Sequence, residues 1–262
     1  MSSSASNYLG ESLGTEIVTI YVGTEPNRKQ FTIHKKLICD KVDFFRKEFM
    51  GGFKENEGTM DLSEEKPAVF GMFVDWLYSS NSQVRKCTTN EQFVGLFNLY
   101  FFAERLCINN LQNRLIDRIR LTAAGILEHE RHGPWITIPF AAFIFNNTAK
   151  GSTIRKYCIH ELAYRLWMQK EKTFDSTLPD SEAMSEISAH WSQQPDLMKE
   201  FFDFLRSAPN EIDPPGIDYE WHQQEVLECR FHNHGKDEIC YVDVEDTEFV
   251  GDTWDEKMVF GD

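Results

Sequence analysis

The stretch that most constrains the fold runs from Gln30 to Leu62, because the spacing of its apolar residues changes twice within it. At its start apolar and polar residues alternate, which predicts a strand with one buried face. Apolar residues four apart then predict a helix, before alternation returns at residues 59–62. The pattern is carried by Phe31, Ile33, Phe45, Phe49, Met60 and Leu62. The sequence therefore predicts a compact strand–helix–helix–strand unit, in which Asp40 or Asp43 caps the second helix.

The flanking segments supply another strand and several helices that can cover this unit. Residues 16–22 are nearly all β-formers, which predicts a central strand covered on both sides. Apolar residues at helical spacing predict three helices after residue 66, the first of which opens at Pro67. Their stripes are Phe70, Phe73, Val74 and Leu77; Phe93, Leu96, Phe97, Tyr100 and Phe101; and Leu111, Leu115 and Ile119. We interpret these stripes as packed core.

Residues 31–39, with the sequence FTIHKKLIC, resemble the signature of the BTB/POZ domain, which is a protein-interaction fold. Residues 67–78 and 99–107 fit the same family in order and spacing. The resemblance implies an α/β (α+β) fold, a small sheet flanked by helices, over residues 14–125. Residues 133–240 resemble, less specifically, the helical regions of uncharacterised fungal BTB proteins.

The resemblance also implies which residues bind partners. BTB domains carry an acid and a base as a charged pair near the dimer-facing pocket, and Glu16 and Lys35 stand at these positions. In BTB adaptors a hydrophobic residue, any residue and an acid form a cullin-contacting motif, which Phe53 and Glu55 match. Tyr78 matches a second family contact position. Because the segment before Glu16 is short, we expect a weak homodimer.

The formal net charge of −15 is concentrated at the end of the chain. Residues 211–262 hold 16 Asp and Glu against 3 Lys and Arg, whereas the preceding residues are nearly neutral. This balance argues against nucleic-acid binding, which needs a basic surface. We therefore expect a disordered N-terminus over 1–13, the BTB/POZ domain over 14–125, a helical C-terminal region over 133–210, and an acidic, mostly disordered tail over 211–262.

We expect an intracellular protein of the cytoplasm or nucleus that binds no membrane. The first residues have no apolar region of the kind that a secretory signal needs, and the longest apolar run, residues 135–145, is too short to cross a bilayer. In a reducing compartment, cysteines among apolar residues are expected to be buried and unpaired. These are Cys39, Cys87, Cys107 and Cys158.

The sequence contains no recognisable catalytic constellation, and we expect no cofactor. It lacks a phosphate-binding glycine-rich loop, a nucleophile elbow and a His-Glu-x-x-His motif. We interpret His34 as a histidine that is hydrogen-bonded at a strand–helix junction, in preference to a catalytic base.

One tract near the end of the chain has the composition of a metal site. Cys229, His232, His234 and Cys240 match the ligand set of a structural zinc site, although only one residue separates the two histidines. In an extended segment, a His-x-His pair directs both rings to one side. The alternative is a hairpin in the tail with free cysteines and exposed histidines. The composition favours this alternative, so we do not assign a metal from sequence.

The function that the resemblance implies is a non-enzymatic protein–protein interaction module. It self-associates, and one form of this function is a substrate adaptor of a cullin-RING ubiquitin ligase. An alternative is a transcriptional regulator that acts through partners, since no DNA-binding module is visible. A zinc-binding enzyme is a weaker alternative, because only the Cys/His tract supports it.

Overall fold

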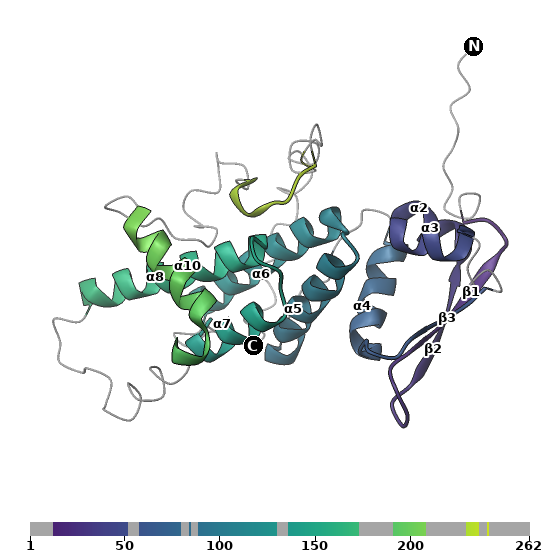
Figure 1. Ribbon diagram of the computed structural model, residues 1–262, viewed down its shortest axis with the longest axis horizontal. Helices are drawn as coiled ribbons and strands as arrows, with labels where there is room; N and C mark the ends of the chain where they lie inside the picture. The colour runs from purple at the N-terminus through teal and green to yellow at the C-terminus, as the bar shows by residue number, and fades with distance from the viewer. Residues whose placement is uncertain are drawn as a thin grey trace, which may run out of the picture. The chain divides into compact units, whose positions relative to one another are not determined.

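The computed structural model describes residues 13–51, 58–79, 84, 89–129, 136–172, 191–207, 229–235 and 240 (Figure 1). The chain divides into two compact units. The first comprises Met1–Thr122 with Asn146–Thr148, and the second comprises Ala123–Phe145 with Ala149–Asp262.

A three-stranded sheet lies in the first unit, with strand order β2-β1-β3. The central strand β1 (Ile17–Val22) pairs antiparallel with β2 (Lys29–His34) and parallel with β3 (Thr59–Leu62). The register places Val18 opposite Ile33 and Ile20 opposite Met60, so the buried side chains of neighbouring strands meet on one face. The three strands that the sequence predicted are confirmed.

The prediction that both faces of the first strand are covered is wrong. Val18, Ile20 and Val22 are buried, but Thr19 and Tyr21 on the other face are only half-buried, and Ile17 is 59% exposed. Buried and half-buried residues alternate along the strand. The sequence does not reveal this alternation, because Thr and Tyr suit a solvated face of a sheet as well as a buried one. The chain then leaves β1 at Gly23, where φ is +81° and a Cβ would lie 3.0 Å from Pro67 Cγ.

Among the described residues up to 129, five helices follow or interrupt these strands, and the sequence predicted each of them. They are α2 (Lys35–Lys41), α3 (Asp43–Met50), α4 (Pro67–Tyr78), α5 (Asn90–Arg105) and α6 (Asn109–His129). Pro67 occupies the first turn of α4.

The expected cap of α3 is not formed. Val42 is the N-cap residue, and its side chain caps no backbone N–H. Asp43 lies one position further on, inside the first turn, where its carboxylate pairs with Arg46. A carboxylate at this position still favours the positive end of the helix dipole.

An aromatic cluster, defined as Phe45, Phe49, Phe70, Phe73 and Phe102, forms part of the core of the first unit. Phe73 is its centre, with ring centroids 6.0 Å from Phe45, 5.4 Å from Phe70 and 5.3 Å from Phe102. All five side chains are at most 1% exposed. These rings come from α3, α4 and α5, so the cluster fixes the helices to one another.

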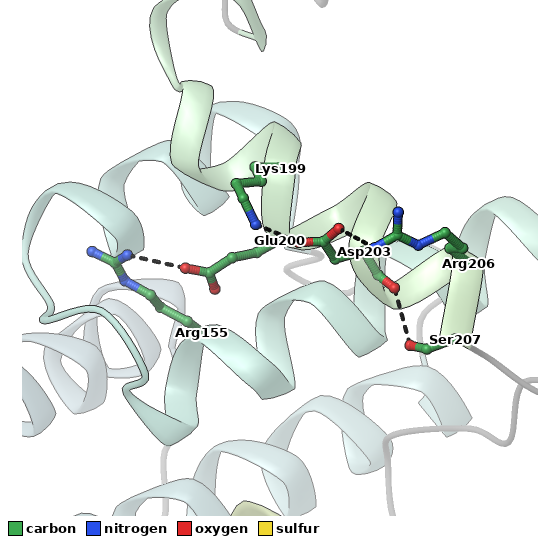
Figure 2. A network of polar contacts seen from close by, with 6 residues as sticks. All are labelled: Arg155, Lys199, Glu200, Asp203, Arg206 and Ser207. Atoms are coloured by element: carbon green, nitrogen blue, oxygen red, sulfur yellow. Dashed lines mark hydrogen bonds and ion pairs between the residues drawn. The ribbon is translucent and has the colours of Figure 1, made fainter.

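The second unit contains α7 (Ile138–Asn146), α8 (Thr153–Lys172), α10 (Pro195–Ser207) and the short 3-10 turn η3 (Cys229–Phe231). Buried Arg155 connects three of these helices. Its Nη2 donates to the carbonyl oxygen of Phe145 at 2.7 Å, and its guanidinium lies 4.4 Å from the Phe145 ring centroid. Its Nη1 lies 3.5 Å from Glu200 Oε1 of α10. Figure 2 draws this ion pair as a dashed line.

The cysteines are only partly as expected. Cys39 and Cys158 are buried, but Cys107 is exposed, at the turn after α5, with a φ of 55°. Cys107 is exposed because it lies in this turn, although its apolar neighbours in the sequence suggested burial. Cys87 lies outside the described residues. No helix in the described part of the chain combines the length and the apolar composition that crossing a membrane requires.

Candidate functional site

Glu16 and Lys35 lie together where β1 begins and α2 begins. Lys35 Nζ is 3.3 Å from Glu16 Oε2, and the Lys35 backbone N–H donates to the Glu16 carbonyl oxygen at 2.9 Å. The carboxylate is 75% exposed, whereas the lysine side chain is 24% exposed. Exposed Ile17 follows directly in sequence. The backbone bond therefore holds a charged pair beside an exposed apolar side chain.

Tyr78 connects the end of α4 to the junction between β2 and α2 through contacts with His34. Its hydroxyl accepts from the backbone N–H of His34 at 3.1 Å and lies 2.8 Å from His34 Nδ1. Both side chains are half-buried. The interpretation of His34 as a hydrogen-bonded junction residue agrees with this geometry. Any partner that contacts Tyr78 meets a side chain that already has a structural role.

A second contact holds the same helix end. Lys41 Nζ donates to the carbonyl oxygen of Leu77 at 2.9 Å and lies 5.4 Å from the Trp76 ring centroid. Burial, with a smaller contribution from nearby Arg114, lowers the pKa of Lys41. The lysine therefore supplies a donor to a carbonyl that the helix itself leaves unpaired.

The proposed cullin motif, Phe53 and Glu55, lies outside the described residues. Its flanks are described: α3 ends at Met50 and β3 begins at Thr59. Met50 is 57% exposed, so a large apolar side chain directly precedes the segment that contains the motif.

The four residues of the Cys/His tract, here called the Cys/His cluster, converge in the second unit. One potential ligand atom from each of Cys229, His232, His234 and Cys240 lies within 4.8 Å of those from the others. His232 Nδ1 is 3.3 Å from Cys240 Sγ, and the two imidazole centroids are 5.6 Å apart. His232 and Cys240 are buried, His234 is half-buried and Cys229 is exposed.

Phe231 places this cluster on helix α8. It is 3% exposed, and its ring lies edge-on to those of Tyr157 and His160, at 5.5 Å and 5.8 Å between centroids. The turn itself is closed by a hydrogen bond from the His232 backbone N–H to the Cys229 carbonyl oxygen at 2.9 Å. Two of the cluster residues are therefore positioned by a turn that a buried ring anchors.

The model of one protein family, the BTB/POZ domain, matches residues 17–116 of this chain. Residues 17–116 are a BTB/POZ domain. Because BTB/POZ domains are interaction modules, the chain contains a protein–protein interaction module. The match includes Ile17, Lys35, His34 and Tyr78, and it leaves the Cys/His cluster outside. A comparison with curated proteins finds no match to this chain.

Sequence reasoning missed two residues that matter to these sites. Phe231 was not recognised as an anchor, although an aromatic residue beside His-x-His could have suggested one. Arg155 was not singled out, because it directly follows Ile154 in the sequence and nothing there indicated that its charge would be buried.

Proposed function

We propose that the BTB/POZ domain of this chain forms a homodimer through the start of β1. The main support for this proposal is that Ile17, an apolar residue next to the Glu16–Lys35 pair, is exposed. Apolar anchors that a partner desolvates contribute most to binding, and charges around them set orientation. One exposed isoleucine and one ion pair make a small contact, so the dimer is weak.

The experiment compares dimer dissociation constants by sedimentation velocity of the full chain. Ile17→Lys places a charge at the centre of the contact, and we expect it to weaken the dimer by at least about ten-fold, equivalent to ~1.4 kcal/mol. Val94→Lys is the matched control, because Val94 is an exposed apolar residue on α5. Equal dimerisation of the two variants, or a strictly monomeric wild type at high micromolar concentration, would reject the proposed interface.

A charge swap tests the role of the pair. Glu16→Lys and Lys35→Glu should each weaken the dimer, because each puts like charges at two positions whose charged atoms lie 3.3 Å apart in the wild type. The double variant restores opposite charges and should recover most of the loss. If the double variant is as weak as the single ones, the two residues act separately and the pair does not orient the partner.

The second part of the proposal is that the domain serves as an adaptor for a cullin. Its support is the position of Phe53-Lys54-Glu55 between α3 and β3, three residues after exposed Met50. An aromatic side chain is a common interface anchor, and an adjacent acid adds a directional contact. The client then binds elsewhere on the chain.

Titration of the full chain against a cullin N-terminal domain tests the adaptor role. Phe53→Ala should cost at least ~2 kcal/mol of binding, and Glu55→Ala should cost less. Lys54→Ala, between the two, is the control and should bind as wild type does. Absence of wild-type binding at tens of micromolar, or equal binding of all three variants, contradicts this part.

A further inference from the structure

We propose that the Cys/His cluster binds one zinc ion, which holds residues 229–235 and Cys240 on helix α8. The proposal concerns the second unit and is independent of dimerisation and of cullin binding. Its ligands are Cys229, His232, His234 and Cys240.

The distances fit a tetrahedral site. With Zn–S bonds of about 2.3 Å and Zn–N bonds of about 2.0–2.1 Å, ligand atoms at the corners of a tetrahedron lie about 3.3–3.8 Å apart. The ligand atoms of the cluster lie within 4.8 Å of one another, and His232 Nδ1 is already 3.3 Å from Cys240 Sγ. Side-chain shifts of about 1 Å complete the geometry.

One histidine of the cluster lacks a partner that a metal would supply. Nε2 of His234 is buried and has no hydrogen-bond partner. A buried polar atom without a partner costs about 1–3 kcal/mol, so native structures rarely retain one without a reason. Coordination of zinc by a ring nitrogen satisfies a buried acceptor of this kind.

The ligand set selects the metal and its role. Two thiolates and two imidazoles in tetrahedral arrangement are typical of zinc, whereas magnesium and calcium prefer oxygen ligands. Because all four positions are taken by protein, none remains for a water molecule or a substrate. The site is therefore structural, which argues against the zinc-enzyme alternative.

The turn that carries Cys229 and His232 is held in place without a metal. Phe231, between Cys229 and His232, is held by Tyr157 and His160 of α8, and the turn hydrogen bond fixes the first two ligands relative to each other. A site whose ligands are positioned before binding loses less conformational entropy when the ion arrives. The ion then ties Cys240, eleven residues along the chain from Cys229, to the same anchored turn.

Metal content of the full chain, purified under reducing conditions from zinc-supplemented cells, is the first measurement. We expect about one zinc per chain, in line with a single four-ligand site. Cys240→Ser and His234→Gln should each lose most of it. Cys107→Ser is the matched control, since it removes an exposed thiol of the first unit, and it should keep the wild-type zinc content.

The second measurement is local and does not depend on global stability. Arg230 is exposed and lies between two ligands, so trypsin cleavage after Arg230 reports whether the turn stays docked. Wild type and Cys107→Ser should resist this cleavage with zinc and become sensitive after chelation. Cys240→Ser and His234→Gln should be sensitive in both conditions, with a helical circular dichroism spectrum like that of wild type.

A cobalt titration adds a spectroscopic check, because tetrahedral cobalt with thiolate ligands absorbs visible light strongly. The proposal is overturned by wild-type protein that binds no zinc, or by zinc retained in both cluster variants. It is also overturned by trypsin cleavage that zinc does not affect. A Cys229–Cys240 disulfide in the reduced, purified protein, seen by intact-mass measurement, has the same consequence.

Discussion

The aromatic cluster of the BTB/POZ domain and the surroundings of Arg155 in the second unit are both buried, yet different interactions hold them together. The side chains of Phe73 and its neighbours contact one another through apolar rings. Arg155 instead joins a backbone carbonyl, a carboxylate and an aromatic ring. Apolar packing responds mainly to lost volume, whereas a buried charge responds to the loss of any one partner. The two regions should therefore fail under different perturbations.

Truncation at the centre of the aromatic cluster has the largest expected effect on the BTB/POZ domain. Phe73→Ala should reduce the free energy of unfolding by ~3–5 kcal/mol, because it leaves a cavity among well-packed rings. Urea denaturation followed by tryptophan fluorescence measures the loss. Val94→Ala, at an exposed position of the same unit, should stay within about 0.5 kcal/mol of wild type. A loss of similar size in both variants would contradict the central role of the cluster.

Removal of the buried guanidinium is the corresponding change in the second unit. Arg155→Ala should cost about 3 kcal/mol, because it leaves the Phe145 carbonyl and the Glu200 carboxylate without their partner. Arg206→Ala is the matched control, since Arg206 of α10 pairs with Asp203 at the surface (Figure 2) and is 82% exposed. The control should show no measurable loss, as is common for exposed ion pairs. Equal losses would mean that burial of Arg155 carries no special cost.

Alkaline pH should lower the stability of the second unit through ionisation of Cys158. Burial, with a smaller contribution from Glu161, raises the pKa of its thiol above the ordinary value of 9.0. A raised folded pKa contributes stability that is complete below the unfolded pKa and falls as pH rises above it. The free energy of unfolding should therefore decrease above pH 9.0 by up to ~1.4 kcal/mol per pH unit from this group.

The measurement is urea denaturation of wild type and Cys158→Ala at about pH 8 and about pH 10, on either side of the thiol's ordinary pKa. The alanine variant loses the Cys158 contribution and keeps those of all other groups, so its stability should fall less between the two pH values. Parallel declines would show that Cys158 ionises as readily in the folded chain as in the unfolded one.

The smallest expected effect concerns a polar contact inside the BTB/POZ domain. Tyr78→Phe removes the hydroxyl that accepts from the His34 backbone N–H and contacts its ring, and should cost about 1 kcal/mol. A double-mutant cycle with His34→Ala separates the ring contact from the backbone bond. If Tyr78→Phe weakens cullin binding but leaves stability unchanged, the hydroxyl serves a partner and not the junction.

Much of the BTB/POZ fold follows from the sequence because its periodicities are local. The alternation at residues 59–62 and the helix start at Pro67 needed no knowledge of distant contacts. The faces of β1 were misjudged, since Thr19 and Tyr21 suit either side of a sheet. The α3 cap was misjudged because two aspartates near Val42 offered plausible alternatives, and the chain uses neither as the N-cap.

For the Cys/His cluster, the sequence supplied only the residue types of a metal site and not their arrangement in space. Residues 232–235 form neither strand nor helix, so no periodicity tells where the rings point. Nothing in the sequence pattern indicates that Cys240 lies close to the other three residues. Phe231 anchors the turn that positions Cys229 and His232, and its contact with Tyr157 spans more than seventy residues of sequence.

Through that long-range contact, the affinity of the Cys/His cluster for zinc is coupled to the packing of Phe231 on α8. If zinc strengthens the docking of Phe231 on α8, the docked ring strengthens the hold on zinc by the same factor, because thermodynamic coupling is reciprocal. A substitution of Tyr157 should then raise the zinc dissociation constant although it touches no ligand. Conversely, the free zinc concentration should set the fraction of molecules in which the turn Cys229–Phe231 packs on α8.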